Sequence, residues 1–183
     1  MTAYFKKVTK GFTLIELLIV MAILGVLAVV VLVAINPVQQ LARTRDAGRK
    51  SGVTQIGHAL EAYYTSRNGL YPAEAAAWLS DIVAAGELAV VPSGITYSAG
   101  PVACANQVVG VPATWCYDYD AVNGNIIAYA RLESNPERSK CGAIVNNTNP
   151  SAWFVFSSAD GRGGLVCNTG AAEPAAGTQT WTD

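Results

Sequence analysis

One acidic residue of this 183-residue chain stands where a charge is costly. Glu16 lies five residues into an apolar run that starts at Phe12, and the following stretch from Leu17 to Ile35 has neither charge nor proline. An unpartnered carboxylate inside such a span costs about 2.5–3.5 kcal/mol on insertion scales. Glu16 is therefore predicted to have a partner and a function.

A partner for Glu16 would be created by cutting the chain after Gly11. Phe12 would then begin the chain with a positive α-amine, and Phe12 and Glu16 are i and i+4 on one helical face. The amine of the same chain, or that of a neighbouring copy, could neutralise the carboxylate. In the second case the pair would set the stagger between copies, because the charge is relieved only when they align.

Two other polar patterns offer chemistry of a different kind. Asp118, Asp120 and Asn123 lie in a predicted hairpin, and oxygen ligands at alternate positions can bind calcium. The spacing does not follow the EF-hand loop, so a turn without metal is favoured and no cofactor is expected. His58 is the sole histidine, and without a serine–histidine–acid arrangement the chain is not predicted to be an enzyme.

The four cysteines all lie in the C-terminal half of the chain. Their even number, behind an export-like N-terminus, predicts two disulfides in an oxidising compartment rather than four free thiols. No CxxC pair is present, which argues against a zinc site. Three pairings are open, and Cys104–Cys116 with Cys141–Cys167 is favoured because each bond closes a segment between neighbouring strands.

A basic cluster follows the apolar run, although the chain as a whole is not basic. The net charge is −1, and it becomes −4 without the first eleven residues, which hold three lysines and no acid. This balance argues against a dedicated nucleic-acid-binding protein. The cluster is interpreted as a surface for lipid headgroups or for ion pairs between copies, with DNA binding as the alternative. Its members are Arg43, Arg45, Arg49 and Lys50.

One long helix is predicted to position these groups, from Phe12 to about Arg67, with a length of roughly 80 Å. Residues 12–36 are apolar on all sides and long enough to cross the roughly 30 Å hydrocarbon core of a membrane. Gly25 and Pro37 are the positions where this helix is expected to bend or melt. The lysines before the span favour a cytoplasmic N-terminus, with the remainder outside.

The second half of the long helix, residues 37–68, has one apolar face and must pack against a partner. A head at residues 69–170 is predicted to supply it, with a short helix at Ala73–Ala85 and an antiparallel sheet of about four strands. The fold class is therefore α+β. Residues 171–183 are predicted to be a loose tail. The strand-like segments are Gly94–Tyr97, Thr114–Tyr119, Ile126–Leu132, Ala152–Ser157 and Gly164–Cys167.

Two simpler explanations of the N-terminus fit less well. A secretory signal peptide has an apolar core of about 7–15 residues and then a small-residue cleavage site, and this run is longer and has no such site. A plain membrane anchor leaves Glu16 unexplained. The segment Lys10–Glu16, KGFTLIE, followed by the unbroken apolar run, instead resembles the class III signal of type IV pilins and pseudopilins.

The resemblance implies a leader peptide at residues 1–11, cleavage after Gly11 by a prepilin peptidase, N-methylation of Phe12 and a role for Glu16 in subunit register. It also implies a pilin fold. The detailed similarity covers about Lys10 to Pro72, and the rest is similar only in general organisation. Many family members have a proline inside the apolar run, whereas here the first proline is Pro37.

A structural subunit of a type IV pilus is the function that the resemblance implies. Its partners would be other copies of the chain, the prepilin peptidase and methyltransferase, and an inner-membrane assembly platform. The precursor would lie in the inner membrane before it joins an extracellular pilus or a periplasmic pseudopilus. A pseudopilin of a type II secretion system, and a minor or DNA-uptake pilin with a ligand-binding head, are the alternatives; adhesion and secretion are roles of such filaments.

Overall fold

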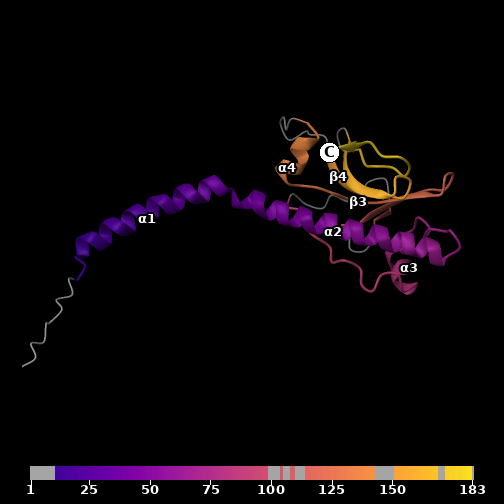
Figure 1. Ribbon diagram of the computed structural model, residues 1–183, viewed down its shortest axis with the longest axis horizontal. Coiled ribbons are helices and arrows are strands. Elements are labelled where there is room, and N and C mark those ends of the chain that lie inside the picture. The colour runs from indigo at the N-terminus through magenta and orange to yellow at the C-terminus, as the bar shows by residue number, and fades with distance from the viewer. Residues whose placement is uncertain are drawn as a thin grey trace, which may run out of the picture. The chain divides into compact units, whose positions relative to one another are not determined.

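The computed structural model describes residues 11–98, 104, 108–109, 114–142, 151–168 and 172–182 (Figure 1). For residues 108–109 the description is of the backbone alone. The chain separates into two units, with the boundary between Gln40 and Leu41. Each unit is described by itself.

The first unit is built around helix α1, Leu14–Ile35. Thr13 caps its N-terminus, and no residue of the helix is buried. The helix passes through Gly25 and ends at Asn36, which takes the left-handed conformation with a φ of 47°. The predicted long helix is therefore interrupted at the expected Pro37 step and not at Gly25, because the left-handed Asn36 cannot continue a right-handed helix.

Helix α2, Pro37–Ser66, starts immediately after this interruption. Proline suits a first helical position because its φ is preset and its missing N–H is not needed there. From Ala42 onward, one side of α2 is buried in the second unit. The helix is followed by Asn68 and Gly69, both with positive φ, which turn the chain away from it.

Within the described residues, the second unit contains an antiparallel sheet of six strands, which lie in chain order from one edge to the other. The prediction of about four strands was too low, because the two edge strands have only two residues each. Gly94–Tyr97, predicted as a strand, has no regular structure. The strands are β1 Val108–Val109, β2 Cys116–Asp120, β3 Asn125–Arg131, β4 Ser151–Ser157, β5 Arg162–Asn168 and β6 Trp181–Thr182.

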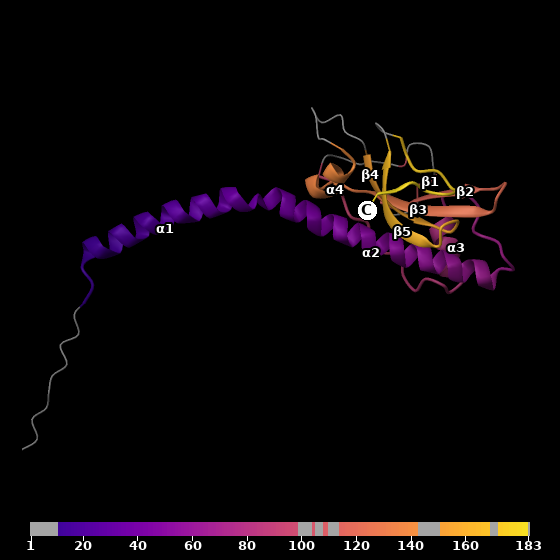
Figure 2. The same cartoon turned by 45° about the horizontal axis from the view of Figure 1, so that its top comes forward.

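One face of the sheet packs against α2 and the short helix α3, Trp78–Ala84 (Figure 2). Ile56 and Leu60 of α2 are fully buried against strand residues such as Tyr117 and Ile126. The helix comes close to the sheet because Gly52 and Gly57 lie under aromatic rings. A Cβ at Gly52 would overlap Trp115, and one at Gly57 would overlap Phe156.

The opposite face of the sheet is covered by residues of the C-terminal segment, including Ala176 and Trp181. Trp181 lies in β6, which pairs with β5, and a Cβ added at Gly164 would come within 2.8 Å of its ring. The prediction of a loose tail at 171–183 was therefore wrong for the described residues 172–182. These residues are held by strand pairing and by an indole that packs on a glycine.

Two disulfide bonds staple the second unit. Cys104 is bonded to Cys116 of β2, with 5.8 Å between their Cα atoms. Cys141, at the end of helix α4 (Asn135–Lys140), is bonded to Cys167 of β5, with 5.3 Å between their Cα atoms. These are the two pairs that the sequence favours, and the second one ties α4 to the sheet.

Candidate assembly site

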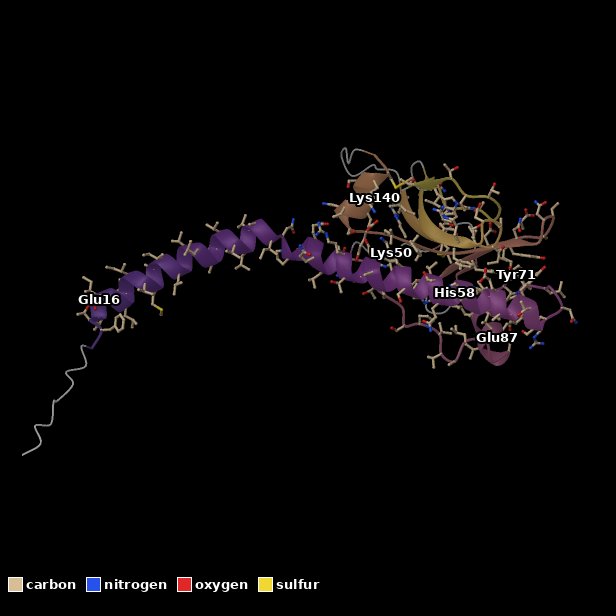
Figure 3. All side chains as sticks on the ribbon, viewed as in Figure 1. Glu16, Lys50, His58, Tyr71, Glu87 and Lys140 are labelled. Carbon is tan, nitrogen blue, oxygen red and sulfur yellow. A yellow bond between two sulfur atoms is a disulfide. The ribbon has the colours of Figure 1, made fainter. Side chains whose placement is uncertain are left out.

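The N-terminus of α1 holds the carboxylate that the sequence singles out. The Glu16 Oε2 atom accepts two hydrogen bonds from Thr13, at 2.8 Å from the backbone N–H and at 2.7 Å from the hydroxyl. In return, the Glu16 N–H donates to Thr13 Oγ1 at 3.3 Å. The two residues therefore form a reciprocal capping box at the first turn of the helix, where Figure 3 labels Glu16.

The capping box explains how the chain tolerates a carboxylate next to an apolar helix. Its oxygen is satisfied by Thr13, and it lies at the positive end of the helix dipole. Thr13 was missed in the sequence, where Glu16 was expected to depend on an amine created by cleavage. The signal was available, because a threonine followed three residues later by glutamate, before an apolar run, is typical of a helix start.

The rest of α1 is a cylinder of exposed aliphatic side chains. Its 22 residues correspond to about 33 Å of helix. Among the described helices, α1 alone is long and apolar enough by length and composition to cross a membrane. A helix that is apolar on all sides is stable only in lipid or among other apolar helices.

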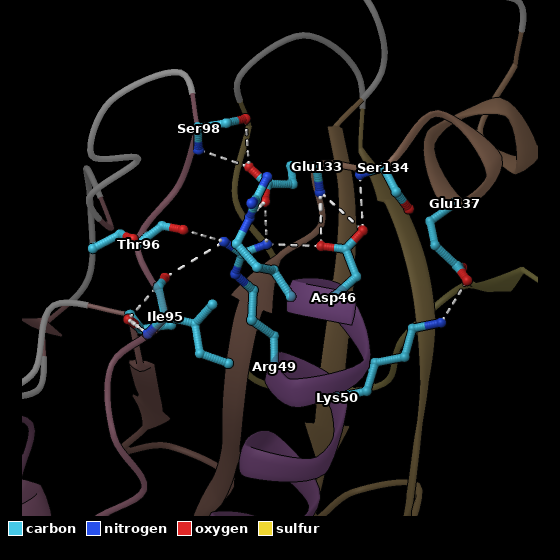
Figure 4. Close-up of polar contacts among 11 residues, drawn as sticks. Asp46, Arg49, Lys50, Ile95, Thr96, Ser98, Glu133, Ser134 and Glu137 are labelled. Atoms are coloured by element: carbon cyan, nitrogen blue, oxygen red, sulfur yellow. Dashed lines mark hydrogen bonds and ion pairs between the residues drawn. The ribbon is translucent and has the colours of Figure 1, made fainter. Parts of the chain in front are cut away.

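The basic cluster after α1 is mostly engaged inside the second unit, contrary to the prediction of an outward-facing surface (Figure 4). Arg49 is fully buried and pairs with Asp46 at 2.8 Å and with Glu133 at 3.3 Å. It also donates hydrogen bonds to the carbonyl oxygens of Ile95 and Thr96. Buried charges are tolerated when they are paired and hydrogen-bonded in this way.

The neighbours of Arg49 in the cluster have partners of their own. Arg45 pairs with Glu133, and Lys50 pairs with Glu137 of α4 at 2.7 Å. Arg43 is the one exposed residue of the four, whereas Arg45 and Lys50 are half-buried and Arg49 is buried. The cluster therefore offers much less free positive charge to DNA or lipid than its sequence indicates.

Asp46 and Glu133 join α2 to the turn between β3 and α4. Asp46 accepts hydrogen bonds from the backbone N–H groups of Glu133 and Ser134, the latter at 2.8 Å. Burial alone would raise the pKa of Glu133, but hydrogen bonds from Ser98 and Arg45 outweigh it and lower that pKa.

The buried position of Arg49 and Asp46 could have been found from the helical period of the sequence. Counting back from Val53 by 4 and then 3 residues places both on the buried face of α2.

The weak calcium candidates serve as acceptors for the chain itself. Asp120 accepts from the backbone N–H of Val122 at 2.9 Å and from the amide of Asn123 at 2.6 Å, which shapes the turn between β2 and β3. The hydrogen bonds from Asn123 and then Val122 lower the pKa of Asp120. Asp118 accepts from the backbone N–H of Ala176. Within the described residues, no group of three or more metal-binding side chains is found.

His58 lies on the outer side of α2. Its side chain is 68% exposed, with Nδ1 at 3.5 Å from Glu61 and its ring against the edge of Phe156. Neither contact supplies a serine or cysteine nucleophile for the imidazole to activate.

Comparison with known proteins bears on the N-terminal site. Residues 6–32 match the model of the prokaryotic N-terminal methylation motif. The matched stretch contains Gly11, Phe12, Thr13 and Glu16. This match supports the resemblance of the N-terminus to that of type IV pilins and pseudopilins. No curated protein and no solved structure matches this pilin-like chain. Its long N-terminal helical region and antiparallel sheet are consistent with an α+β pilin fold.

Proposed function

We propose that this pilin-like chain is the structural subunit of a type IV pilus. The observation that carries the proposal is α1 itself, a fully exposed apolar helix that begins with a capped carboxylate inside the methylation motif. Such a helix can reside in the membrane as a precursor and then pack against copies of itself in a filament core. Type IV pilins are structural proteins, and no catalytic step is assigned to this chain.

The proposed cleavage after Gly11 would create a new N-terminus one residue before the capping box. The Thr13 backbone nitrogen, 2.8 Å from Glu16 Oε2, is only three bonds away from the nitrogen of Phe12. Cleavage after Gly11 would turn that Phe12 amide into a positive amine. The carboxylate is therefore already positioned for an amine at residue 12, of its own chain or of a neighbouring copy.

Two partners of different strength would then compete for Glu16. Both partners donate to an ionised carboxylate, but the amine also carries a full positive charge, so it adds a coulombic attraction that the neutral Thr13 donors lack. The amine would therefore displace Thr13, or share the carboxylate with it, once the leader is removed. The precursor keeps its carboxylate satisfied in the membrane, while the mature chain gains a contact that depends on subunit alignment.

The second unit would form the outer part of the filament. Its two disulfides suit a domain that must stay folded outside the cytoplasm. The precursor would lie in the inner membrane with its leader in the cytoplasm, where the prepilin peptidase and the assembly platform would act on it. The methylation motif is shared with pseudopilins, so the length and location of the assemblies decide between the two.

Substitution of Glu16 tests the proposal. We expect Glu16→Ala to abolish or strongly reduce filaments, while the precursor still inserts in the membrane and is still cleaved. Electron microscopy of surface filaments and membrane fractionation would measure the two properties separately. Gln55→Ala, at an exposed position of α2 outside the apolar helix, is the control for expression and membrane insertion. Normal filaments from Glu16→Ala would refute the proposed role of this carboxylate.

A further inference from the structure

The second unit separates its charges into two groups. Residues 41–52 and 131–142 together hold seven bases and three acids. Residues 59–87 and 116–125 together hold six acids and one base. The first group therefore has a net charge of +4 and the second a net charge of −5, although the chain as a whole is almost neutral.

The two groups lie at opposite ends of the unit. The start of α2 is joined to α4 by Lys50, whose amine lies 2.7 Å from Glu137, and Lys140 contacts the same carboxylate. We call this region the basic end. The last turns of α2, helix α3 and the β2–β3 hairpin make up the acidic end. Figure 3 shows Lys50 and Lys140 toward one end, and Tyr71 and Glu87 toward the other.

Each end keeps a net charge, because its acids and bases differ in number. At the basic end, all three acids are already paired: Asp46 with Arg49, Glu133 with Arg45, and Glu137 with Lys50. At the acidic end, burial and then the charge of Asp118 raise the pKa of Glu74. A surface divided in this way repels itself at each end and attracts an oppositely charged surface.

We propose that the basic end of one copy docks on the acidic end of the next copy along the filament. This inference rests on the proposed function, because it requires subunits with parallel α1 helices. Parallel packing gives every head the same direction, so a head-to-tail contact between copies joins unlike ends. A second copy of this chain is the partner that complements both surfaces at once, whereas DNA or anionic lipid would complement only the basic end.

The contact between the two ends would mainly determine how neighbouring subunits align, and would contribute little to their binding affinity. At physiological salt, charges are screened beyond about 8 Å, so the two ends attract only when they are close to contact. Complementary surface charges mainly provide specificity and association rate. The apolar α1 helices would supply most of the affinity, and the two ends would align the heads.

Two exposed arginines near opposite ends of α2 allow a matched test in the full-length chain. Arg43 lies at the basic end, and Arg67, which directly follows α2, lies at the acidic end. Arg43→Glu and Arg67→Glu change the net charge by the same amount. We expect Arg43→Glu to lower the yield of filaments at least about threefold, since surface ion pairs contribute modestly and reversal adds repulsion. Arg67→Glu should leave the yield unchanged or raise it.

A compensating change makes the test specific for contact between the two ends. Asp81 is exposed on α3 at the acidic end, and Asp81→Lys combined with Arg43→Glu should restore most of the filament yield. Equal yields from all variants, or equal losses from Arg43→Glu and Arg67→Glu, would overturn the inference. So would unchanged filaments together with weaker binding of the Arg43→Glu precursor to anionic phospholipid vesicles. Absence of filaments from the unsubstituted chain would instead overturn the proposed function itself.

Discussion

At the scale of single residues, the chain keeps two carboxylates in unusual places by giving each a short-range partner. Glu16 is capped by Thr13 at the start of an exposed apolar helix, and Asp46 is buried against Arg49. Glu16 could be found in the sequence because one charge interrupts an apolar run. Arg49 was misread as part of an outward-facing basic surface, because residue type was given more weight than helical period.

The role of the capping box can be measured at Thr13. Thr13→Val keeps the shape of the side chain and removes the hydroxyl, which should destabilise the start of α1 by about 1 kcal/mol. Because Glu16 would keep only the backbone N–H, we expect fewer filaments from an equal amount of precursor. Quantitative electron microscopy measures the yield. Thr13→Ser retains the hydroxyl and should behave like the unsubstituted chain; a deficit of the same size in Thr13→Ser would contradict this role.

At the scale of elements, the α2–sheet contact explains the glycines of α2. In the sequence they appear only to weaken the helix, but Gly52 and Gly57 are where the aromatic rings of Trp115 and Phe156 lie. Helix α2 and the central strands could be predicted, because their apolar residues recur with the spacing of a helix or of a strand. The edge strand β6 was not, since its two residues are held by pairing with β5 and by packing on Gly164 rather than by local preference.

Gly57→Ala tests this close approach. In an isolated helix the change would be favourable by about 1 kcal/mol. Here the new methyl group overlaps Phe156, so we expect a net loss of about 1–3 kcal/mol in the free energy of unfolding. Tryptophan fluorescence of the detergent-solubilised full chain during denaturation measures it. Gln55→Ala, on the exposed side of α2, is the control and should shift stability by less than about 0.5 kcal/mol. A stabilised Gly57→Ala variant would contradict the packing described.

The junction of α2 with α4 should make stability depend on pH. Burial raises the pKa of Glu133 and Glu137, but hydrogen bonds and cations outweigh it, so both pKa values are lowered from 4.5. A lowered pKa in the folded state contributes stability that is fully present above pH 4.5 and is lost as pH falls through the folded-state pKa. We therefore expect the melting temperature to fall on acidification below pH 4.5.

Glu133→Gln identifies the source of this pH dependence. The variant cannot gain a proton at residue 133, so its melting temperature should be lower than that of the unsubstituted chain at pH 7 and should fall less between pH 5 and pH 3. Thermal melts followed by circular dichroism give both values. An equally steep fall in the variant would place the pH sensitivity elsewhere in the chain.

At the scale of the whole molecule, the chain combines an N-terminal helix without internal partners and a disulfide-stapled head with a self-contained core. The helix requires an apolar environment, and the head supplies the polar and charged surface. The N-terminal half of this organisation could be predicted from its apolar run and motif. The six-stranded sheet and the distribution of charge between its two ends depend on contacts between residues far apart in the sequence, which no local pattern reports.

On the proposed function, α1 becomes an assembly element when the leader is removed after Gly11. Mass spectrometry of the N-terminal peptide from isolated assemblies tests it most directly. We expect a chain that begins at Phe12 and carries one methyl group on its α-amine. Assemblies built from chains that still begin at Met1, in cells that contain an active prepilin peptidase, would contradict it.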